Sequence, residues 1–194
     1  MMSDLTYFAI FKPYDMLSQF TGEANDSLLG DLYDFPKDVY PIGRLDKDSE
    51  GLLLLTNDNG FKTQLLDPLS KVAKTYLVQV DGDITADAIQ LLSLGKITIK
   101  HNGKEHRVLP AQCKKIAPPE NLPERSVPVR FRKNIPTSWI KLTITEGKNR
   151  QIRKMTAAAG FPTLRLIRIG IGKFRLNEFE PGMVTSIRKG DILL

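Results

Sequence analysis

The chain has 194 residues, of which 41% are hydrophobic and 26% charged, with a net charge of +6, as expected of a globular protein with one sizeable domain or two small interlocked ones. No apolar stretch approaches the roughly 18 residues that a membrane-spanning helix needs, and the N-terminal residues have neither the basic leader nor the cleavage site of a signal peptide. The single cysteine, Cys113, excludes an internal disulfide and fits a reducing cytoplasm, and one cysteine with two histidines argues against a structural zinc site.

The first hundred residues predict strands that alternate with short helices. Residues 7–13 form an apolar strand that Pro13 stops, because proline has no N–H to continue a strand. Four leucines within residues 51–58 indicate a buried strand that ends in a turn. Residues 74–82 alternate in polarity, as in a strand with one polar face. We also expect a helical turn within residues 27–35 and helices at residues 60–68 and 85–95.

The second half contains further strands and a proline-rich segment. We expect strands at residues 96–100, 105–116 and 138–147, and a strand pair at residues 164–176. Residues 117–136 hold five of the twelve prolines and are predicted to form a surface loop, because a strand pattern resumes directly after them. The irregular alternation and tight connections favour an α+β fold, with a mixed, mostly antiparallel sheet and helices packed on it.

A helix is predicted within residues 148–162, where two sets of side chains lie on different faces. Apolar or small residues recur at helical spacing and would face a core: Ile152, Met155, Thr156 and Ala159. Arg150 and Arg153 lie on another face, and Gly160 gives the signal for the end of the helix. We therefore expect one face of this helix to pack against the core and another face to carry the arginines.

Charge is distributed unevenly along the chain. Residues 1–100 carry 9 basic and 15 acidic residues, a net charge of −6, whereas residues 101–194 carry 19 and 7, a net charge of +12. A basic half on an ordinary domain is the electrostatic pattern of a protein that binds a polyanion. In residues 130–133 an aromatic side chain lies among cations, so we predict phosphate contacts from Arg130, Arg132 and Lys133.

The usual catalytic motifs are absent from the sequence. It contains no phosphate loop, no dinucleotide-binding glycine turn and no serine nucleophile elbow. The candidates for chemistry are therefore carboxylates, arginines and tyrosines. Asp46, in the loop before the leucine strand, is ionised at neutral pH and can act as a nucleophile. At the edge of a buried strand an aspartate has a raised pKa, and a neighbouring guanidinium is needed to restore the charged form. The segment NRQIR contains two arginines that could provide it.

Four segments together resemble one enzyme family. They are similar to motifs of the ribosomal-RNA pseudouridine synthases of the small-subunit type and their large-subunit relatives: GRLDKDSEGLLLLTND, KTYLVQV, EGKNRQIRKM and FKPYDMLSQ. Each motif alone is weak, and together they are specific. The resemblance covers nearly the whole chain. It is strongest for the E-type subgroup, which acts on large-subunit rRNA.

The resemblance implies a role for each matching residue. Asp46 corresponds to the nucleophile, Arg153 to the arginine that pairs with it, and Tyr76 to a tyrosine that lies against the target base. Ile152 corresponds to the apolar residue behind that tyrosine. Arg44 corresponds to the arginine that enters the gap left by the flipped nucleotide. Further RNA contacts are expected from the neighbouring residues Lys74, Arg150 and Gln151.

The resemblance also implies the organisation and the reaction. It predicts a pseudouridine synthase catalytic domain over residues 1–194, with two interlocked subdomains, an active-site cleft between them and no N-terminal RNA-binding domain. The enzyme would be a cytoplasmic monomer that isomerises a uridine of 23S rRNA, free or in an assembly intermediate. Attack on the ribose and attack on the base are both compatible with these residues. Isomerisation transfers no net electrons, so we expect neither a cofactor nor a metal.

Two other classes of function were weighed against this one. A non-catalytic rRNA-binding module would explain the charge and needs no nucleophile. A glycoside hydrolase would need a second acid with a raised pKa facing Asp46, and the third motif supplies arginine there instead. In the nearby loop we interpret Asp48 as a turn former and Glu50 as a partner of the residues around the site.

Overall fold

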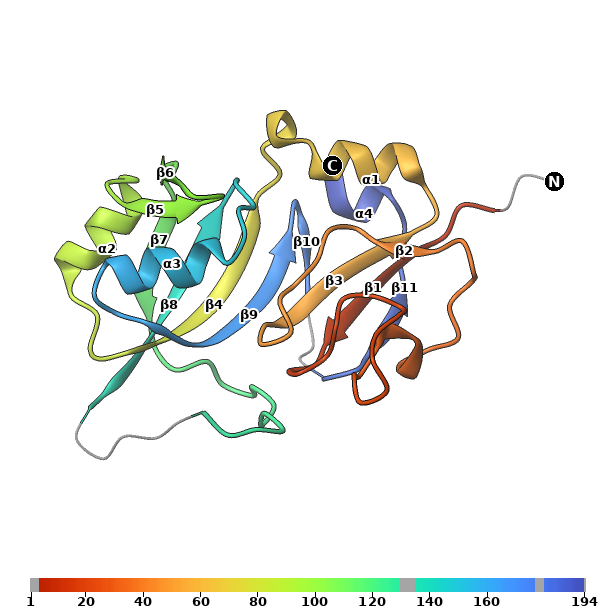
Figure 1. The fold of residues 1–194 in the computed structure, drawn as a ribbon, viewed down its shortest axis with the longest axis horizontal. Helices are drawn as coiled ribbons and strands as arrows, with labels where there is room; N and C mark the ends of the chain where they lie inside the picture. Colours follow the sequence, from red (N-terminus) through yellow and green to blue (C-terminus); the bar gives the residue numbers. More distant parts are fainter. Residues whose placement is uncertain (1–3, 130–134, 177–179, 194) are drawn as a thin grey trace.

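The computed structural model describes residues 4–129, 135–176 and 180–193. Its main element is a nine-stranded sheet with the order β11-β1-β3-β9-β4-β8-β7, in which β2 also pairs with β3 and β10 with β9 (Figure 1). The strands of this sheet are β1 (Tyr7–Lys12), β2 (Tyr40–Pro41), β3 (Glu50–Thr56), β4 (Lys74–Asp81), β7 (Gln112–Ile116), β8 (Thr137–Ile144), β9 (Thr163–Ile171), β10 (Phe174–Arg175) and β11 (Val184–Ser186). A separate hairpin is formed by β5 (Thr98–His101) and β6 (Lys104–Arg107).

The described helices are short. They are α1 (Asn59–Leu66), α2 (Ala86–Ser93), α3 (Gln151–Ala158) and α4 (Gly190–Leu193), with 3-10 turns at η1 (Leu29–Asp31) and η2 (Pro68–Ser70). In the described part of the chain, no helix is long and apolar enough to cross a membrane.

The predicted fold class is confirmed. Among the described strands of the large sheet, β3 and β9 pair in parallel and the other pairings are antiparallel.

The prediction of one strand over residues 105–116 is wrong. β6 pairs with β5, whereas β7 pairs with β8 in the large sheet, and Pro110 lies in the break between them. Proline lacks the N–H that a continuous strand would use.

The core consists of two apolar clusters on opposite faces of the sheet. Successive residues of a strand point to opposite faces, and Phe8 and Leu53 belong to one cluster whereas Ala9 and Leu52 belong to the other. Helices α2 and α3 contribute to the first cluster and α1 and α4 to the second. Figure 1 shows the two helix pairs over different halves of the sheet.

The two halves of the sheet meet where β3 runs beside β9. Gly51 has φ +101, and a Cβ atom there would lie 2.3 Å from the carbonyl oxygen of Arg168, so only glycine fits this junction. One residue earlier, Glu50 forms a buried ion pair with Arg165 on β9, with oxygen–nitrogen distances of 2.9 and 2.7 Å. The loop that precedes β3 therefore ends at a residue that is fixed in the middle of the sheet.

Candidate active site

Asp46 lies in the tight loop that leads into β3. The N–H of Ser49 donates to the carbonyl of Asp46 at 3.0 Å and closes a turn. One residue before, Leu45 exchanges two hydrogen bonds with the hydroxyl of Ser18, at 3.0 and 2.8 Å. The Asp46 side chain is 31% exposed. Its backbone is thus fixed while its carboxylate remains accessible, as a nucleophile requires.

A buried lysine donates a hydrogen bond to the backbone of this loop. Lys12, at the end of β1, has no exposed surface, and its ammonium donates to the carbonyls of Pro13, Met16 and Lys47 at 2.8, 2.7 and 3.3 Å. Burial lowers the pKa of Lys12 to about 8, although nearby carboxylates, Glu50 first, act in the opposite direction. The lysine of the predicted FKP motif therefore joins the end of β1 to the Asp46 loop.

Helix α3 brings both predicted arginines to the Asp46 loop. Arg150 stands at its N-cap in the left-handed conformation, with φ 51. Its guanidinium donates two hydrogen bonds to the carboxylate of Asp48, at 2.9 and 2.8 Å, and lies 3.5 Å from that of Asp46. Burial raises the pKa of Asp48, but the hydrogen bond from Arg150 and the charges of Arg153 and Arg150 outweigh it, so the net shift is downward.

Arg153 lies deeper, with 14% of its side chain exposed. Its guanidinium donates to the backbone carbonyl of Asp48 at 2.7 Å and lies 3.4 Å from the Asp48 carboxylate. Burial lowers the pKa of Arg153, while the charges of Asp48 and Asp46 oppose that shift. We predicted Arg153 as the partner of Asp46. Among the described residues the ion pair with Asp46 comes from Arg150, and Arg153 acts on Asp46 through its electric field.

Tyr76 and Ile152 are both buried in the core. Tyr76 lies in the middle of β4, is 7% exposed and belongs to the same apolar cluster as Ile152 of α3. Across the sheet it pairs with Arg168 of β9, next to the junction with β3. The structure thus places the tyrosine and an isoleucine of the arginine helix in one apolar cluster, and their roles in the reaction stay predictions.

Gln151 occupies an internal position. It is 3% exposed, its amide nitrogen donates to Glu146 at 2.7 Å, and its amide oxygen accepts the N–H of Lys148 at 3.0 Å. Glu146 also receives the N–H of Leu109 and contacts a ring nitrogen of His106 at 2.8 Å. This placement fits positioning of the α3 start rather than the RNA contact that we predicted for Gln151.

The remaining predicted RNA contacts differ in accessibility. Arg44 is exposed, and its side chain has no hydrogen-bond or ion-pair partner within the described part of the chain. Lys74 is half-buried at the start of β4 and donates to the carbonyl of Val72 at 3.2 Å; burial, then the charge of Arg168, lowers its pKa. Arg130, Arg132 and Lys133 lie outside the described residues.

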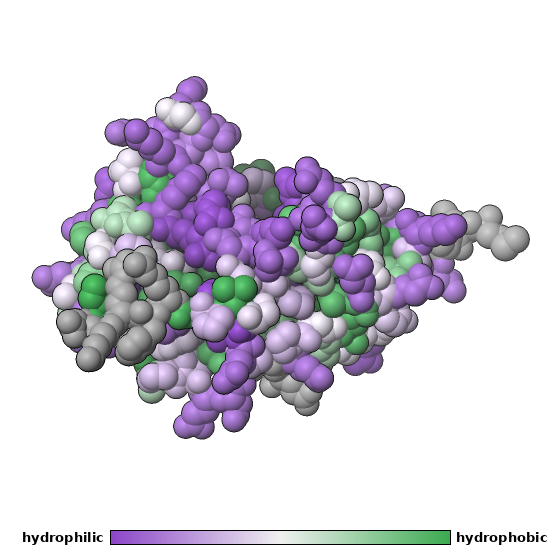
Figure 2. All heavy atoms as spheres, turned by 60° about the horizontal axis from the view of Figure 1, so that its bottom comes forward, coloured by the Kyte–Doolittle hydropathy of each residue, from purple (hydrophilic) through white to green (hydrophobic). Residues whose placement is uncertain are grey.

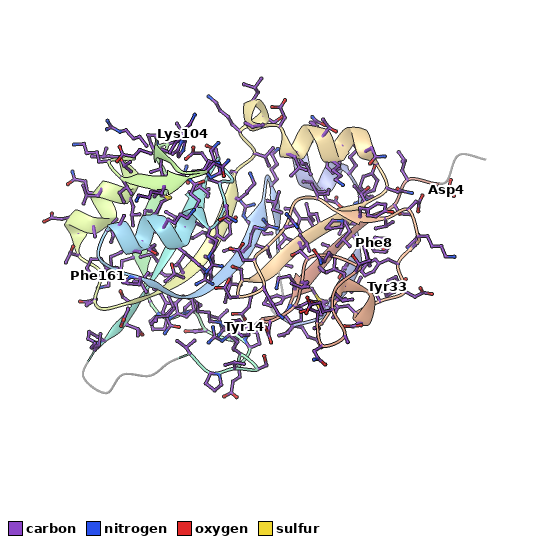
Figure 3. All side chains as sticks on the ribbon, in the orientation of Figure 1. Asp4, Phe8, Tyr14, Tyr33, Lys104 and Phe161 are labelled. Atoms are coloured by element: carbon purple, nitrogen blue, oxygen red, sulfur yellow. The ribbon has the colours of Figure 1, made fainter. Side chains whose placement is uncertain are left out.

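Sequence reasoning missed Asp48 and the pair formed by Tyr14 and Arg125. The Arg125 guanidinium lies over the Tyr14 ring, 4.1 Å from its centroid, and links the proline-rich segment to the turn after β1. Figure 3 labels Tyr14, which lies in this turn. The signal available for Asp48 was its spacing, two residues after Asp46 in the same loop. No group of three or more metal-binding side chains occurs in residues 4–129, 135–176 and 180–193.

A family model described as RNA pseudouridylate synthase matches residues 6–158, a span that includes the Asp46 loop, Tyr76 and all of α3. The chain belongs to the RNA pseudouridylate synthase family. This pseudouridine synthase is therefore an isomerase, and the predicted resemblance is confirmed.

Curated relatives agree with this assignment, and a solved structure shares the fold. Ribosomal large subunit pseudouridine synthase E of Vibrio parahaemolyticus is 49% identical over 177 residues, which are 91% of this chain and 71% of that protein. The protein of the same name from Xanthomonas axonopodis is 47% identical over 172 residues, covering 88% and 87% of the two chains. The crystal structure of a pseudouridylate synthase matches with a TM-score of 0.75 at 24% identity, over 97% of this chain and 72% of that one, and shares the fold.

Proposed function

We propose that this pseudouridine synthase isomerises one uridine of large-subunit ribosomal RNA and that Asp46 is its nucleophile. The observation that carries the proposal is an accessible carboxylate on a rigid loop, faced by two arginines from a helix about a hundred residues further along the chain. The names of the curated relatives supply the class of RNA.

The target base must leave the RNA stack before a protein carboxylate can reach it. Extrusion costs a few kcal/mol. Stacking of an aromatic or guanidinium group offsets this at about 1–3 kcal/mol per base. In our proposal Arg44, which is exposed beside the Asp46 loop, fills the gap in the stack. Tyr76 then lies against the flipped uracil, supported by Ile152 of the same cluster.

The chemistry at the flipped uridine is a rearrangement within one nucleotide. The N-glycosidic bond breaks, the uracil turns, and a carbon–carbon bond to the ribose forms. In our proposal Asp46 attacks as the carboxylate, with the guanidinium of Arg150 3.5 Å away. No net oxidation or reduction occurs, so the proposed reaction proceeds with the side chains of this chain alone.

The second acid of the loop is unsuited to glycoside hydrolysis. An inverting or retaining hydrolase needs a carboxylic acid with a raised pKa beside its other carboxylate. Asp48 has a lowered pKa because Arg150 and Arg153 neutralise it. This observation favours the synthase over the hydrolase that we weighed as an alternative.

The RNA is proposed to lie across the side of the molecule that carries the Asp46 loop and the proline-rich segment. The side shown in Figure 2 is largely hydrophilic around its middle. The net charge of +12 on residues 101–194 would attract the phosphates. We further propose that residues 1–194 act as one catalytic unit, a monomer in the cytoplasm. Strands β1 and β9 each contribute residues to both apolar clusters, which favours a single unit.

The test is to map pseudouridines in rRNA from cells with and without this protein, and then to restore the missing site in vitro. Purified protein should convert a single uridine of the large-subunit rRNA. The matched control is Asp46→Asn, which keeps the shape of the side chain and removes its charge. It should bind the same RNA and form no product. A wild-type protein that binds rRNA but leaves uridine unchanged would establish the non-catalytic binding module instead.

A further inference from the structure

Asp48 is the common partner of both arginines at the start of α3. Its carboxylate receives the two-pronged fork of Arg150, at 2.9 and 2.8 Å, and lies 3.4 Å from Arg153. Its backbone carbonyl accepts a second contact from Arg153, at 2.7 Å. Two parallel N–H···O bonds to a carboxylate fix the direction of a guanidinium as well as its distance. One residue thus sets the orientation of both cations.

The arginines depend on this anchor because their own helix does little to hold them. Arg150 occupies the N-cap in the left-handed conformation, and no side chain caps that end of α3. Its side chain is 42% exposed. The Nε of Arg153 is buried and has no hydrogen-bond partner among the described residues. Without the Asp48 carboxylate, Arg150 would lose its fork and Arg153 its ion pair at 3.4 Å, while Arg153 would keep only its bond to the backbone carbonyl.

Asp46 and Asp48 compete for the same cations, and the geometry favours Asp48. Arg150 makes a bidentate contact with Asp48 but only a 3.5 Å approach to Asp46. A carboxylate that accepts a fork from arginine has one lone pair of each oxygen engaged and its charge neutralised, so it is a poorer nucleophile. The fork on Asp48 therefore leaves the oxygens of Asp46 available while keeping positive charge close to them.

We propose that Asp48 is a positioning residue of the reaction: it holds Arg150 and Arg153 beside Asp46 and prevents Arg150 from clamping the nucleophile. The proposal rests on the proposed function, because it assigns Asp48 a task at the same site. Asp48 itself touches no reacting atom in this scheme. It acts through the arginines, so its loss should lower the rate of the chemical step more than the affinity for RNA.

The decisive variant is Asp48→Asn, compared with Asp48→Glu and with the control Asp15→Asn. Asp15 is an exposed acid close to the same loop, 3.8 Å from Lys47, and asparagine tolerates its positive φ of 65. In single-turnover reactions on rRNA from cells lacking the protein, Asp48→Asn should lower the rate by about 100-fold, the usual effect of a displaced catalytic group. Its RNA affinity should change by less than about threefold, and Asp48→Glu should recover part of the rate. Asp15→Asn should retain the wild-type rate.

A double-mutant cycle with Arg150→Gln tests the route of the effect. Groups that act through one another give non-additive losses. Adding Asp48→Asn to Arg150→Gln should therefore cost much less than Asp48→Asn costs alone. Additive losses, or a wild-type rate in Asp48→Asn, would overturn the proposal. An equal loss in Asp15→Asn would do the same, since it would reduce the effect to charge in general.

A structural measurement decides the positioning role independently of the RNA. In ¹⁵N NMR spectra of the free protein, the Nη–H signals of Arg150, which form the fork, should be separately resolved in the wild type and averaged by rotation of the guanidinium in Asp48→Asn. Thermal unfolding should show that the variant remains folded. If the wild type proves inactive on rRNA, the proposed function fails, whereas unchanged arginine signals in Asp48→Asn would refute the anchoring by Asp48.

Discussion

The ammonium of Lys12 donates a hydrogen bond of 3.3 Å to the carbonyl of Lys47, the residue that follows Asp46. The same ammonium also bonds the carbonyls of Pro13 and Met16 and has no contact with solvent. A buried charge is tolerated when its donors are satisfied. Here it links the end of β1 to the loop that carries Asp46, so the stability of that loop should depend on the protonation of a lysine.

We predict an unusual pH dependence from Lys12. Its pKa is lowered from its usual 10.5 to about 8, chiefly by burial. Between these values the unfolded chain binds the proton and the folded chain does not, so stability rises with pH in this window. The free energy of unfolding of the wild type, relative to Lys12→Met, should rise by about 3 kcal/mol from pH 8 to pH 10.5. Urea unfolding at several pH values measures it, and a difference that falls with pH would contradict this assignment.

Substitution of the two arginines of α3 by lysine should lower the reaction rate to different extents. Arg153→Lys keeps a charge but loses the planar fork at a buried position. We expect a large loss of single-turnover rate and a smaller loss of RNA affinity. Arg150→Lys changes the more exposed arginine, which is also the nearest cation to Asp46. A greater rate loss in Arg150→Lys than in Arg153→Lys would assign Arg150, not Arg153, as the main partner of the nucleophile.

Arg44 should affect turnover without contributing much to the electrostatic attraction of RNA. In Arg44→Ala the rate should fall, while the slope of log affinity against log salt changes by at most about 0.7–0.9, one phosphate contact. Charge reversal at Arg130, Arg132 and Lys133 should instead flatten that slope. Lys37→Ala, which removes an exposed lysine of the acidic half, serves as the control. An unchanged slope after the triple reversal would place the RNA on another face.

Asp58 should be a main determinant of stability away from the active site. It caps α1 through the N–H of Phe61 at 2.9 Å and accepts from Tyr7 at 2.7 Å and Lys189 at 3.0 Å, so it joins both ends of the chain. Asp58→Ala should cost about 2–4 kcal/mol in urea unfolding, for the lost cap and the unpaired tyrosine hydroxyl. Asp58→Asn retains a capping oxygen and should cost less.

The same carboxylate predicts a response to acid. The hydrogen bond from the backbone of Phe61, then that from Tyr7, lowers the pKa of Asp58 to about 2. A group with a lowered folded-state pKa contributes stability above its unfolded pKa and loses it as the pH falls toward the folded value. The stability difference between the wild type and Asp58→Asn should therefore be present at pH 5 and shrink between pH 4 and pH 2. A constant difference over this range would refute the role of the charge.

Local pattern predicted the elements that the structure contains around the site. The leucine run became β3, the alternating segment became β4, and the stripe on residues 151–158 became α3, because each is specified by periodicity within a few residues. The small elements β2, β11 and α4 gave no such signal, since two to four residues are too few to show a period. The single strand expected over residues 105–116 failed because local pattern does not reveal that its ends pair with different sheets.

The sequence by itself determined the family and the helix that faces the Asp46 loop, and it predicted Asp46 as the nucleophile, because these depend on short motifs with fixed internal spacing. Only the tertiary structure decided which carboxylate holds which arginine. Asp48 and Arg150 are 102 residues apart, and their contact depends on the parallel pairing of β3 with β9 and on where α3 begins. Two aspartates two residues apart look alike in a motif. In the folded loop the carboxylate of Asp48 receives the arginine fork, whereas that of Asp46 lies 3.5 Å from Arg150, and the two side chains are similarly exposed, at 35% and 31%. The contacts of each carboxylate, and not its exposure, thus separate the proposed anchor from the proposed nucleophile.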